Sequence, residues 1–196
     1  NLNDLIGSRI CHDLISPLGA IGNGVELLSM SGNDVSAAPE LALIGQSVDN
    51  ANARIRFFRV AFGAASPETL MGNNELRSIL QDTYSRARIR IDWRVAADPP
   101  RTEAKLAFLL LQCLESALPV GGVITVFRDR NGHWTLTAAG ERHRIDEALW
   151  RMLSDPEAEA EVKASDVHFA LVEPVASRMG RKVTPVFDAK RITVSF

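Results

Sequence analysis

The segment SRICHDLISPLGAI, residues 8–21, is the part of this 196-residue chain from which most of the other inferences follow. Apolar residues recur through and around it at steps of three and four, which predicts one long amphipathic helix. The stripe consists of Leu2, Ile6, Ile10, Leu14, Leu18, Ile21, Val25 and Leu28. His12 falls outside this stripe, about 200° around the helix from Ile10. We therefore expect its imidazole to be exposed.

The residue types around His12 suit phosphoryl transfer through a side chain. Near neutral pH an imidazole nitrogen can both attack phosphorus and leave again. The carboxylate of Asp13 can hold the N–H of one ring nitrogen, which leaves the other nitrogen unprotonated. Ser16 lies one helical turn beyond His12 on the same face, so its hydroxyl can approach a phosphoryl group there. These residues predict a histidine that can be phosphorylated.

Small or polar residues share the face of His12 and predict a surface that another protein can approach. Arg9, Gly19 and Asn23 are the candidate partner contacts on this face. A lone histidine beside an aspartate on a helix is more often an ordinary surface residue. The order of residues through Ile21 argues against that interpretation, because it resembles the H-box of the dimerisation and phosphoacceptor domain of sensor histidine kinases.

A second apolar seam follows and is typical of a coiled coil. Its members are Leu41, Ile44, Val48, Ala51, Ile55, Phe58 and Phe62. Residues 31–39, which contain Gly, Asn, Ser and Pro, predict the turn of an antiparallel helical hairpin. Two such hairpins make a four-helix bundle, so we expect a homodimer. The alternative is that the seam packs only against its own chain.

A basic cluster lies on the same second helix and is a weaker candidate for contact with a partner. It consists of Arg54, Arg56 and Arg59. Most such clusters are solvated surface, although an acidic pocket of a partner would also suit one.

Length and composition limit the class of protein. The chain is long enough for two small domains. Its formal charge of −2 argues against a dedicated nucleic-acid binder. The sequence has no apolar run typical of a membrane span or signal peptide, so we expect a cytoplasmic protein without membrane contact. Cys11 and Cys113 show no metal-ligand or paired spacing, and we expect both to be reduced, core-type residues.

Small residues and Pro67 interrupt the helical pattern near residues 63–74 and suggest two domains, 1–64 and 65–196. In the second domain, we expect helices at 75–87, 102–118, 145–153 and 165–179, and strands at 88–96, 122–129, 133–139, 182–187 and 191–196. Asn131-Gly132 predicts a tight hairpin. The predicted fold class is α+β, with a helical hairpin followed by an α/β sandwich.

This order of elements resembles the ATP-binding domain of histidine kinases, the GHKL or Bergerat fold. Residues 110–117, LLQCLESA, followed by 121–126, GGVITV, look like the N-box helix and the next strand of that family. Two asparagines that help hold metal and phosphates there correspond to Gln112 and Ser116 here. The aspartate that reads adenine corresponds to Ala138.

The glycine-rich phosphate loop of the same family corresponds to residues 165–170, SDVHFA, which contain no glycine. Side chains there would crowd a cradle of backbone N–H groups. Three parts of the nucleotide site are thus altered together, and phosphoryl transfer depends on such positioning. We expect that the second domain does not bind ATP, and that the chain receives phosphate from another protein.

The whole chain resembles the ChpT-type histidine phosphotransferases of bacterial phosphorelays. The resemblance implies that His12 accepts phosphate from the receiver domain of a CckA-like hybrid histidine kinase. It implies donation to the receiver domains of CtrA-like and CpdR-like response regulators, which control the cell cycle. No cofactor is expected in this chain, because Mg²⁺ would lie in the receiver domain of the partner.

Two other functions stay open at this point. One is an ATP-dependent sensor histidine kinase core in which Gln112, Ser116 and nearby backbone bind ATP and metal in place of the altered residues. The other is a non-catalytic module that binds a kinase or a response regulator through the same bundle. Nucleotide-dependent thermal stabilisation would favour the first, and a biological effect that survives His12→Ala would favour the second.

Overall fold

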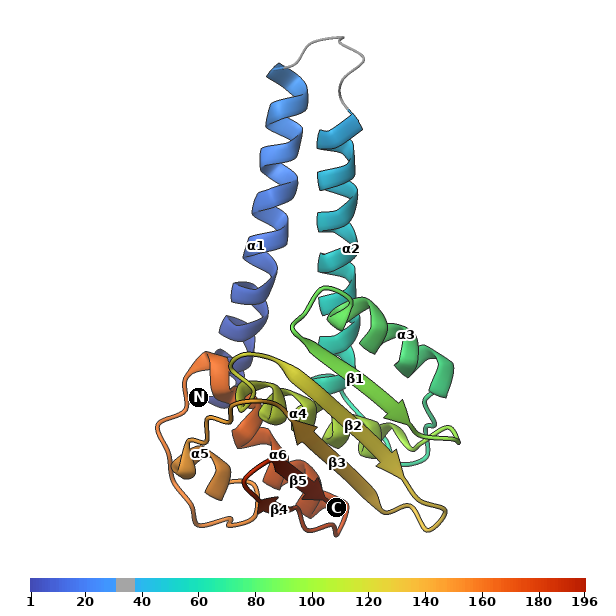
Figure 1. Cartoon of the computed structure of the whole chain (residues 1–196), viewed down its shortest axis with the longest axis vertical. Helices are drawn as coiled ribbons and strands as arrows, with labels where there is room; N and C mark the ends of the chain where they lie inside the picture. The colour runs from blue at the N-terminus through green and yellow to red at the C-terminus, as the bar shows by residue number, and fades with distance from the viewer. Residues whose placement is uncertain (31–37) are drawn as a thin grey trace.

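A computed structural model describes residues 1–30 and 38–196 of the chain. Helices α1 (Leu2–Met30) and α2 (Ala38–Ala61) run antiparallel as a long hairpin that stands on a compact domain (Figure 1). The turn predicted at 31–39 lies mostly outside the described residues. The two helices and their antiparallel arrangement agree with the predicted hairpin.

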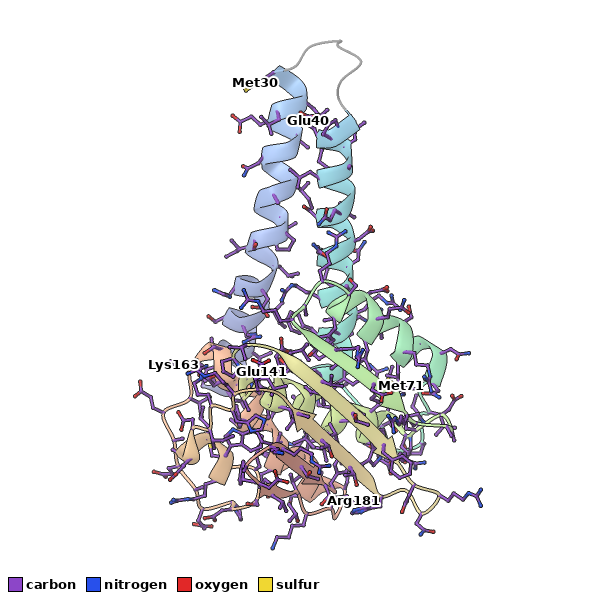
Figure 2. All side chains as sticks on the ribbon, in the orientation of Figure 1. Met30, Glu40, Met71, Glu141, Lys163 and Arg181 are labelled. Carbon is purple, nitrogen blue, oxygen red and sulfur yellow. The ribbon has the colours of Figure 1, made fainter. Side chains whose placement is uncertain are left out.

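The hairpin leaves part of its apolar surface uncovered. In the stripe of α1, Leu18 is 57% exposed and Val25 is 53% exposed. In the seam of α2, Ala51 and Phe58 are buried, but Leu41 is 58% exposed. Side chains project from both helices along the whole length of the hairpin (Figure 2). A single copy of the hairpin therefore does not bury its own seams.

The second part of the chain is a two-layer α/β sandwich. Its elements are α3 (Asn73–Tyr84), β1 (Ile89–Arg94), α4 (Arg101–Ser116), β2 (Gly122–Arg128), β3 (Trp134–Ala139), α5 (Glu147–Arg151), the 3-10 turn η1 (Ala164–Asp166), α6 (Val167–Arg178), β4 (Thr184–Phe187) and β5 (Arg191–Ser195). The strands form one sheet in the order β1-β2-β3-β5-β4. Only the pair β1 and β2 is parallel within the described residues, so the sheet is mixed. This confirms the predicted α+β fold class.

The tight turn between β2 and β3 forms where Asn131-Gly132 predicted it. Gly132 has a φ of +80°, a conformation that side-chain-bearing residues rarely adopt. The carboxylate of Asp129 accepts hydrogen bonds from the backbone N–H groups of Asn131 and His133. The turn brings β2 and β3 into register from Val123 opposite Ala139 to Arg128 opposite Trp134.

One face of the sheet packs against α4 and α6 and forms the core of the sandwich (Figure 1). Trp134 and Phe108 are fully buried there, and the Trp134 ring stacks on Phe196. The indole Nε1 of Trp134 donates to the carboxylate of Glu103, 2.8 Å away. Arg128 also pairs with that carboxylate at 2.9 Å, so its burial is compensated.

The last turns of α2 belong to this same core. Phe57 and Phe58 are buried with residues of α3 and α4. The side chain of Arg101 donates to the carbonyl of Ala64, 2.9 Å away, and that of Lys105 donates to the carbonyl of Gly63, 2.7 Å away. Cations suit the carbonyl end of a helix. The hairpin is thus joined to the sandwich by packing as well as by the chain.

Three predictions are corrected by the structure. Cys11 is exposed, not a core-type residue, because it lies about 100° around α1 from Ile10, outside the apolar stripe. The helix predicted at 145–153 is shorter, since Asp146 caps it and it ends at Arg151. The helix predicted from residue 165 begins as the 3-10 turn η1 and becomes α-helical only at Val167. Across the described residues, no helix is long and apolar enough to cross a membrane.

Candidate functional site

His12 projects from α1 into solvent at the end of the hairpin nearest the sandwich. Its side chain is 86% exposed, whereas that of the adjacent Asp13 is only 10% exposed. The Nδ1 atom of His12 lies 3.2 Å from Oδ1 of Asp13, a contact whose direction depends on the ring tautomer. An exposed imidazole is thus held at one nitrogen by a largely buried carboxylate.

Two arginines hold the other oxygen of the Asp13 carboxylate. The Nε of Arg9 donates to Oδ2 over 2.9 Å, one turn earlier on α1. The Nη1 of Arg54, on α2, lies 3.4 Å from the same oxygen. One oxygen of the Asp13 carboxylate therefore contacts the two arginines, and the other contacts the imidazole of His12.

Arg9 also connects α1 to the sandwich. Its Nη1 donates to the carbonyl of Ser165, 2.7 Å away in η1. The start of α1 lies beside η1 and α6 (Figure 1), and these elements are in contact. Arg9 is thus 23% exposed and spans two parts of the molecule.

A small polar cavity of about 110 Å³ lies behind Asp13, between the hairpin and the sandwich. Arg9, Arg54, Tyr84, Gln112 and Glu115 are among the residues that line it. The Tyr84 hydroxyl donates to Glu115 over 2.9 Å. Burial raises the pKa of the Tyr84 hydroxyl well above its usual range.

Glu115 keeps part of its surface in solvent, but its carboxylate end lies against Tyr84. Desolvation there raises the pKa of Glu115, and Tyr84, Arg9 and Arg54 oppose that rise. Tyr84 and Glu115 were not predicted from the sequence. The only signal was the position of Glu115 three residues after Gln112, on the same side of a helix.

Comparison with known proteins identifies the family. Residues 73–190 match the family described as the histidine phosphotransferase C-terminal domain. The protein phosphotransferase ChpT of Brucella abortus (strain 2308) is 32% identical over 200 residues, which cover 100% of this chain and 94% of that protein. This chain belongs to the ChpT family of histidine phosphotransferases. A solved bacterial phosphotransferase structure is similar with a TM-score of 0.82 and 29% identity, over 99% of this chain and 94% of that one.

The remaining predicted residues of this ChpT-family chain lie at or near His12. Ser16 is exposed on α1 and lines a shallow cavity with residues of α2 and α3, among them Arg54. Gly19 and Asn23 are exposed further along α1. The roles predicted for these residues, for His12 and for Asp13 stay predictions.

The basic cluster predicted on α2 makes different contacts along its length. Arg54 pairs with Asp13, as described above, and Arg56 pairs with Asp82 of α3 at 2.8 Å. The Arg59 side chain is exposed. Contact of these arginines with a partner stays a prediction, and the first two already have partners within the chain.

The positions that correspond to a nucleotide site have other surroundings in this ChpT-family sandwich. Gln112 is 5% exposed, and neither its amide oxygen nor its amide nitrogen has a partner among the described residues. The Ser116 hydroxyl donates to the carbonyl of Cys113, 2.7 Å away in its own helix. Ala138 is fully buried in β3. Residues 165–170 continue from η1 into α6 rather than forming an open loop.

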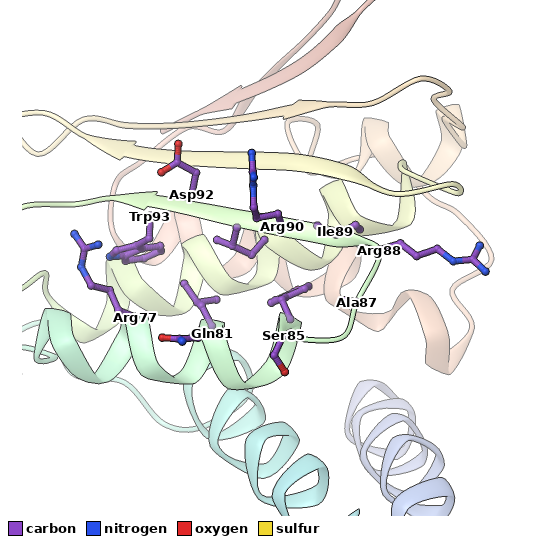
Figure 3. A pocket seen from close by; sticks show the side chains of 12 residues that line it. Arg77, Gln81, Ser85, Ala87, Arg88, Ile89, Arg90, Asp92 and Trp93 are labelled. Atoms are coloured by element: carbon purple, nitrogen blue, oxygen red, sulfur yellow. The ribbon is translucent and has the colours of Figure 1, made fainter. Parts of the chain in front are cut away.

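A larger groove of about 640 Å³ lies between α3 and the open edge of β1 (Figure 3). Arg77 and Gln81 of α3 face Trp93 of β1 across it, while Arg90 and Asp92 project from the other side of the strand (Figure 3). None of its lining residues belongs to α1 or α2. Within the described ranges, no group of three or more His, Cys, Asp or Glu side chains could hold a metal ion. The groove thus does not meet the hairpin, and the surroundings of His12 stay the candidate site.

Proposed function

We propose that His12 is the phosphoacceptor of this histidine phosphotransferase. It takes the phosphoryl group from a receiver-domain aspartate of a hybrid histidine kinase and passes it to the receiver domains of response regulators in the cytoplasm. The observation that carries the proposal is an imidazole that is 86% exposed and has a largely buried carboxylate 3.2 Å from its Nδ1 atom. The resemblance favours a CckA-like donor and CtrA-like and CpdR-like acceptors.

The contact with Asp13 assigns separate roles to the two ring nitrogens. When Nδ1 carries the proton and donates it to Asp13, Nε2 holds a free lone pair that faces solvent. That lone pair attacks the phosphorus of the receiver's aspartyl phosphate, and the P–O bond to the aspartate breaks with its electron pair left on the carboxylate. The ring becomes a phosphorylated imidazolium whose charge Asp13 balances.

We also propose that the sandwich does not bind Mg²⁺-ATP, because the residues at the corresponding positions do not fit it. Ala138 offers no acceptor to an adenine amino group. The Ser116 hydroxyl is turned to its own helix, and Gln112 is 5% exposed. The first turn of α6 occupies the place of a phosphate loop. The phosphoryl group therefore comes from the receiver domain of a partner protein, and that domain also supplies the Mg²⁺.

The working unit in this proposal is a homodimer. Exposed apolar residues recur on each helix of the hairpin at coiled-coil spacing, among them Ile15, Leu18 and Val25 on α1 and Leu41, Val48 and Ile55 on α2. These side chains are 38–67% exposed in a single chain. A second hairpin would cover both stripes and complete a four-helix bundle.

Transfer between purified proteins tests the proposed function. A receiver domain is phosphorylated by its kinase and separated from ATP, and acid-labile label is then followed on the wild-type chain, His12→Gln and His133→Gln. His133 is an exposed histidine of the β2–β3 turn and serves as the matched control. We expect label on the wild type and on His133→Gln but none on His12→Gln.

Two results would contradict the proposal. Equal label on His12→Gln would place the acceptor elsewhere. Label that appears when the chain alone receives ATP and Mg²⁺ would make it a kinase rather than a shuttle.

A further inference from the structure

We infer that Arg9 and Arg54 are positioning residues for phosphoryl transfer, and that the sandwich fixes the geometry of His12 through Arg9. This inference rests on the proposed function of His12. It gives the sandwich a direct part in the reaction, apart from any contact that it makes with a partner.

The first observation is that the two oxygens of the Asp13 carboxylate have different partners. A free carboxylate can turn about its terminal bond and present either oxygen to a neighbour. Here Arg9 and Arg54 both lie against Oδ2, at 2.9 and 3.4 Å. This leaves Oδ1 for Nδ1 of His12. The two cations thus select which oxygen meets the imidazole.

The second step is the anchorage of Arg9 itself. A guanidinium presents several N–H donors in a fixed plane, so it can bind two acceptors at once. Arg9 uses Nε for Asp13 and Nη1 for the Ser165 carbonyl in η1. The position of η1 in the sandwich therefore helps to set the position of the Asp13 carboxylate. No side chain of the sandwich has to reach His12 for this effect.

The third step is the charge balance behind Asp13. The cavity there is lined by two cations, Arg9 and Arg54, and by two carboxylates, Asp13 and Glu115. The hydrogen bond from Tyr84 holds Glu115 in place on the sandwich side. The cluster is thus close to electrically neutral, and removal of either arginine leaves an excess of negative charge beside Asp13. The arrangement is specific to the contact between hairpin and sandwich.

A phosphoryl donor that needs no docking surface separates positioning from partner contact. Phosphoramidate is small enough to phosphorylate an exposed imidazole without a receiver domain. The initial rate of acid-labile labelling at His12 is measured for the wild type, Arg9→Met and Arg54→Met. The matched control is Arg90→Met on the outer face of β1, an exposed arginine distant from α1 (Figure 3). Unfolding by urea confirms that each variant is folded.

We expect each Met variant to be labelled about ten- to hundredfold more slowly, because a small misplacement of a reacting group can cost about 100-fold in rate. Arg90→Met should match the wild type. Nitrogen-15 NMR of the His12 ring supplies a second readout, because the share of the Nδ1–H tautomer should fall in both Met variants. A role confined to folding or to docking would not change that share.

Arg9→Lys tests the part played by the sandwich. Lysine keeps a cation near Asp13 but cannot reach Asp13 and the Ser165 carbonyl with one planar group. We expect its labelling rate to lie between those of the wild type and Arg9→Met. A rate equal to the wild type would remove the sandwich from the inference.

Wild-type rates and tautomer shares in both Met variants would overturn the whole inference, even if transfer from a receiver were slower. That pattern would make the arginines docking residues. A wild-type chain that phosphoramidate does not label at His12 would instead contradict the proposed function on which the inference rests.

Discussion

The helical hairpin and the sandwich place their large apolar side chains in opposite ways. In the sandwich, Trp134, Phe108 and Leu136 are fully buried. In the hairpin, Ile15 is 67% exposed and Met30, at the far end of α1, is 77% exposed (Figure 2). The sandwich therefore satisfies its core within one chain, whereas the hairpin has apolar surface left for another.

The residues of the candidate site, in contrast, lie mainly on the hairpin rather than on the sandwich. The hairpin carries His12 and Asp13, and the sandwich has Ala138 and a buried Gln112 at positions that the sequence resemblance matched to nucleotide-binding residues. Core residues and ligand-binding residues are different sets in the same fold. Under the proposed function, the core keeps the sandwich folded although its nucleotide-binding residues are absent.

The largest expected effect concerns the core of the sandwich and tests whether its large apolar side chains are buried within one chain. Trp134→Ala should lower the free energy of unfolding by about 3–5 kcal/mol, because it removes a fully buried ring and leaves Glu103 without its indole donor. The matched change is Phe127→Ala in the same sheet, where the ring is 47% exposed; its cost should be about 1 kcal/mol or less. Urea unfolding measures both. Similar losses of unfolding free energy for the two variants would contradict a core that lies on one face of the sheet.

The next effect concerns the uncovered stripe of the hairpin. Leu18→Asp should raise the dissociation constant of the proposed dimer about 100-fold, near 2.7 kcal/mol, because two copies of the leucine would each lose a buried site. Asn23→Asp adds the same charge on another side of α1 and should leave association nearly unchanged. Sedimentation equilibrium measures the dissociation constants. A wild-type chain that stays monomeric at every concentration would contradict the proposed homodimer.

A smaller effect sharpens the contrast between buried and exposed histidines. Burial, with a further contribution from Arg9, lowers the pKa of His168 from 6.5 to about 3. Below pH 6.5 the unfolded chain therefore takes up a proton at this residue that the folded chain does not, so stability falls as pH falls toward 3. Between pH 7.5 and 5.5 the wild type should lose about 1.4 kcal/mol more than His168→Leu. Equal losses in urea unfolding would show that His168 does not titrate in this way.

The smallest effect compares two glycines within the hairpin. A methyl group at Gly19 would meet no atom within 4 Å, so Gly19→Ala should stabilise α1 by about 0.5–1 kcal/mol. At Gly24 the added carbon would lie 2.6 Å from Cγ1 of Ile44 in α2, and the gain should be cancelled or reversed. Thermal unfolding measures the pair. A gain at Gly24 equal to that at Gly19 would mean that the seam between α1 and α2 is loosely packed.

Much of the fold was predictable because it depends on local patterns. The period of the apolar residues located the helices and strands, and Asn131-Gly132 located the β2–β3 turn. The start of α5 and the start of α6 were missed, because capping by Asp146 and the 3-10 turn at η1 depend on side-chain and backbone hydrogen bonds rather than on apolar periodicity. Cys11 was misplaced because an apolar pattern does not reveal which side of a helix its neighbours cover.

The candidate site was predictable only in part, for a related reason. The sequence placed His12 and Asp13 side by side, and a helical period placed His12 away from the apolar stripe. It could not show that Arg9 contacts a carbonyl 156 residues further along the chain. Nor could it pair Tyr84 with Glu115, since contacts between distant segments follow from the packing of whole elements.

The burial of Phe57 and Phe58 in the sandwich also has a kinetic consequence. The hairpin cannot change its angle to the sandwich without bringing these two rings into water, at a cost of about 1.5–3 kcal/mol for each. Under the proposed function, a receiver domain that approaches His12 therefore meets a surface whose shape is already set. Little conformational entropy is lost on contact, so even a brief encounter can be productive.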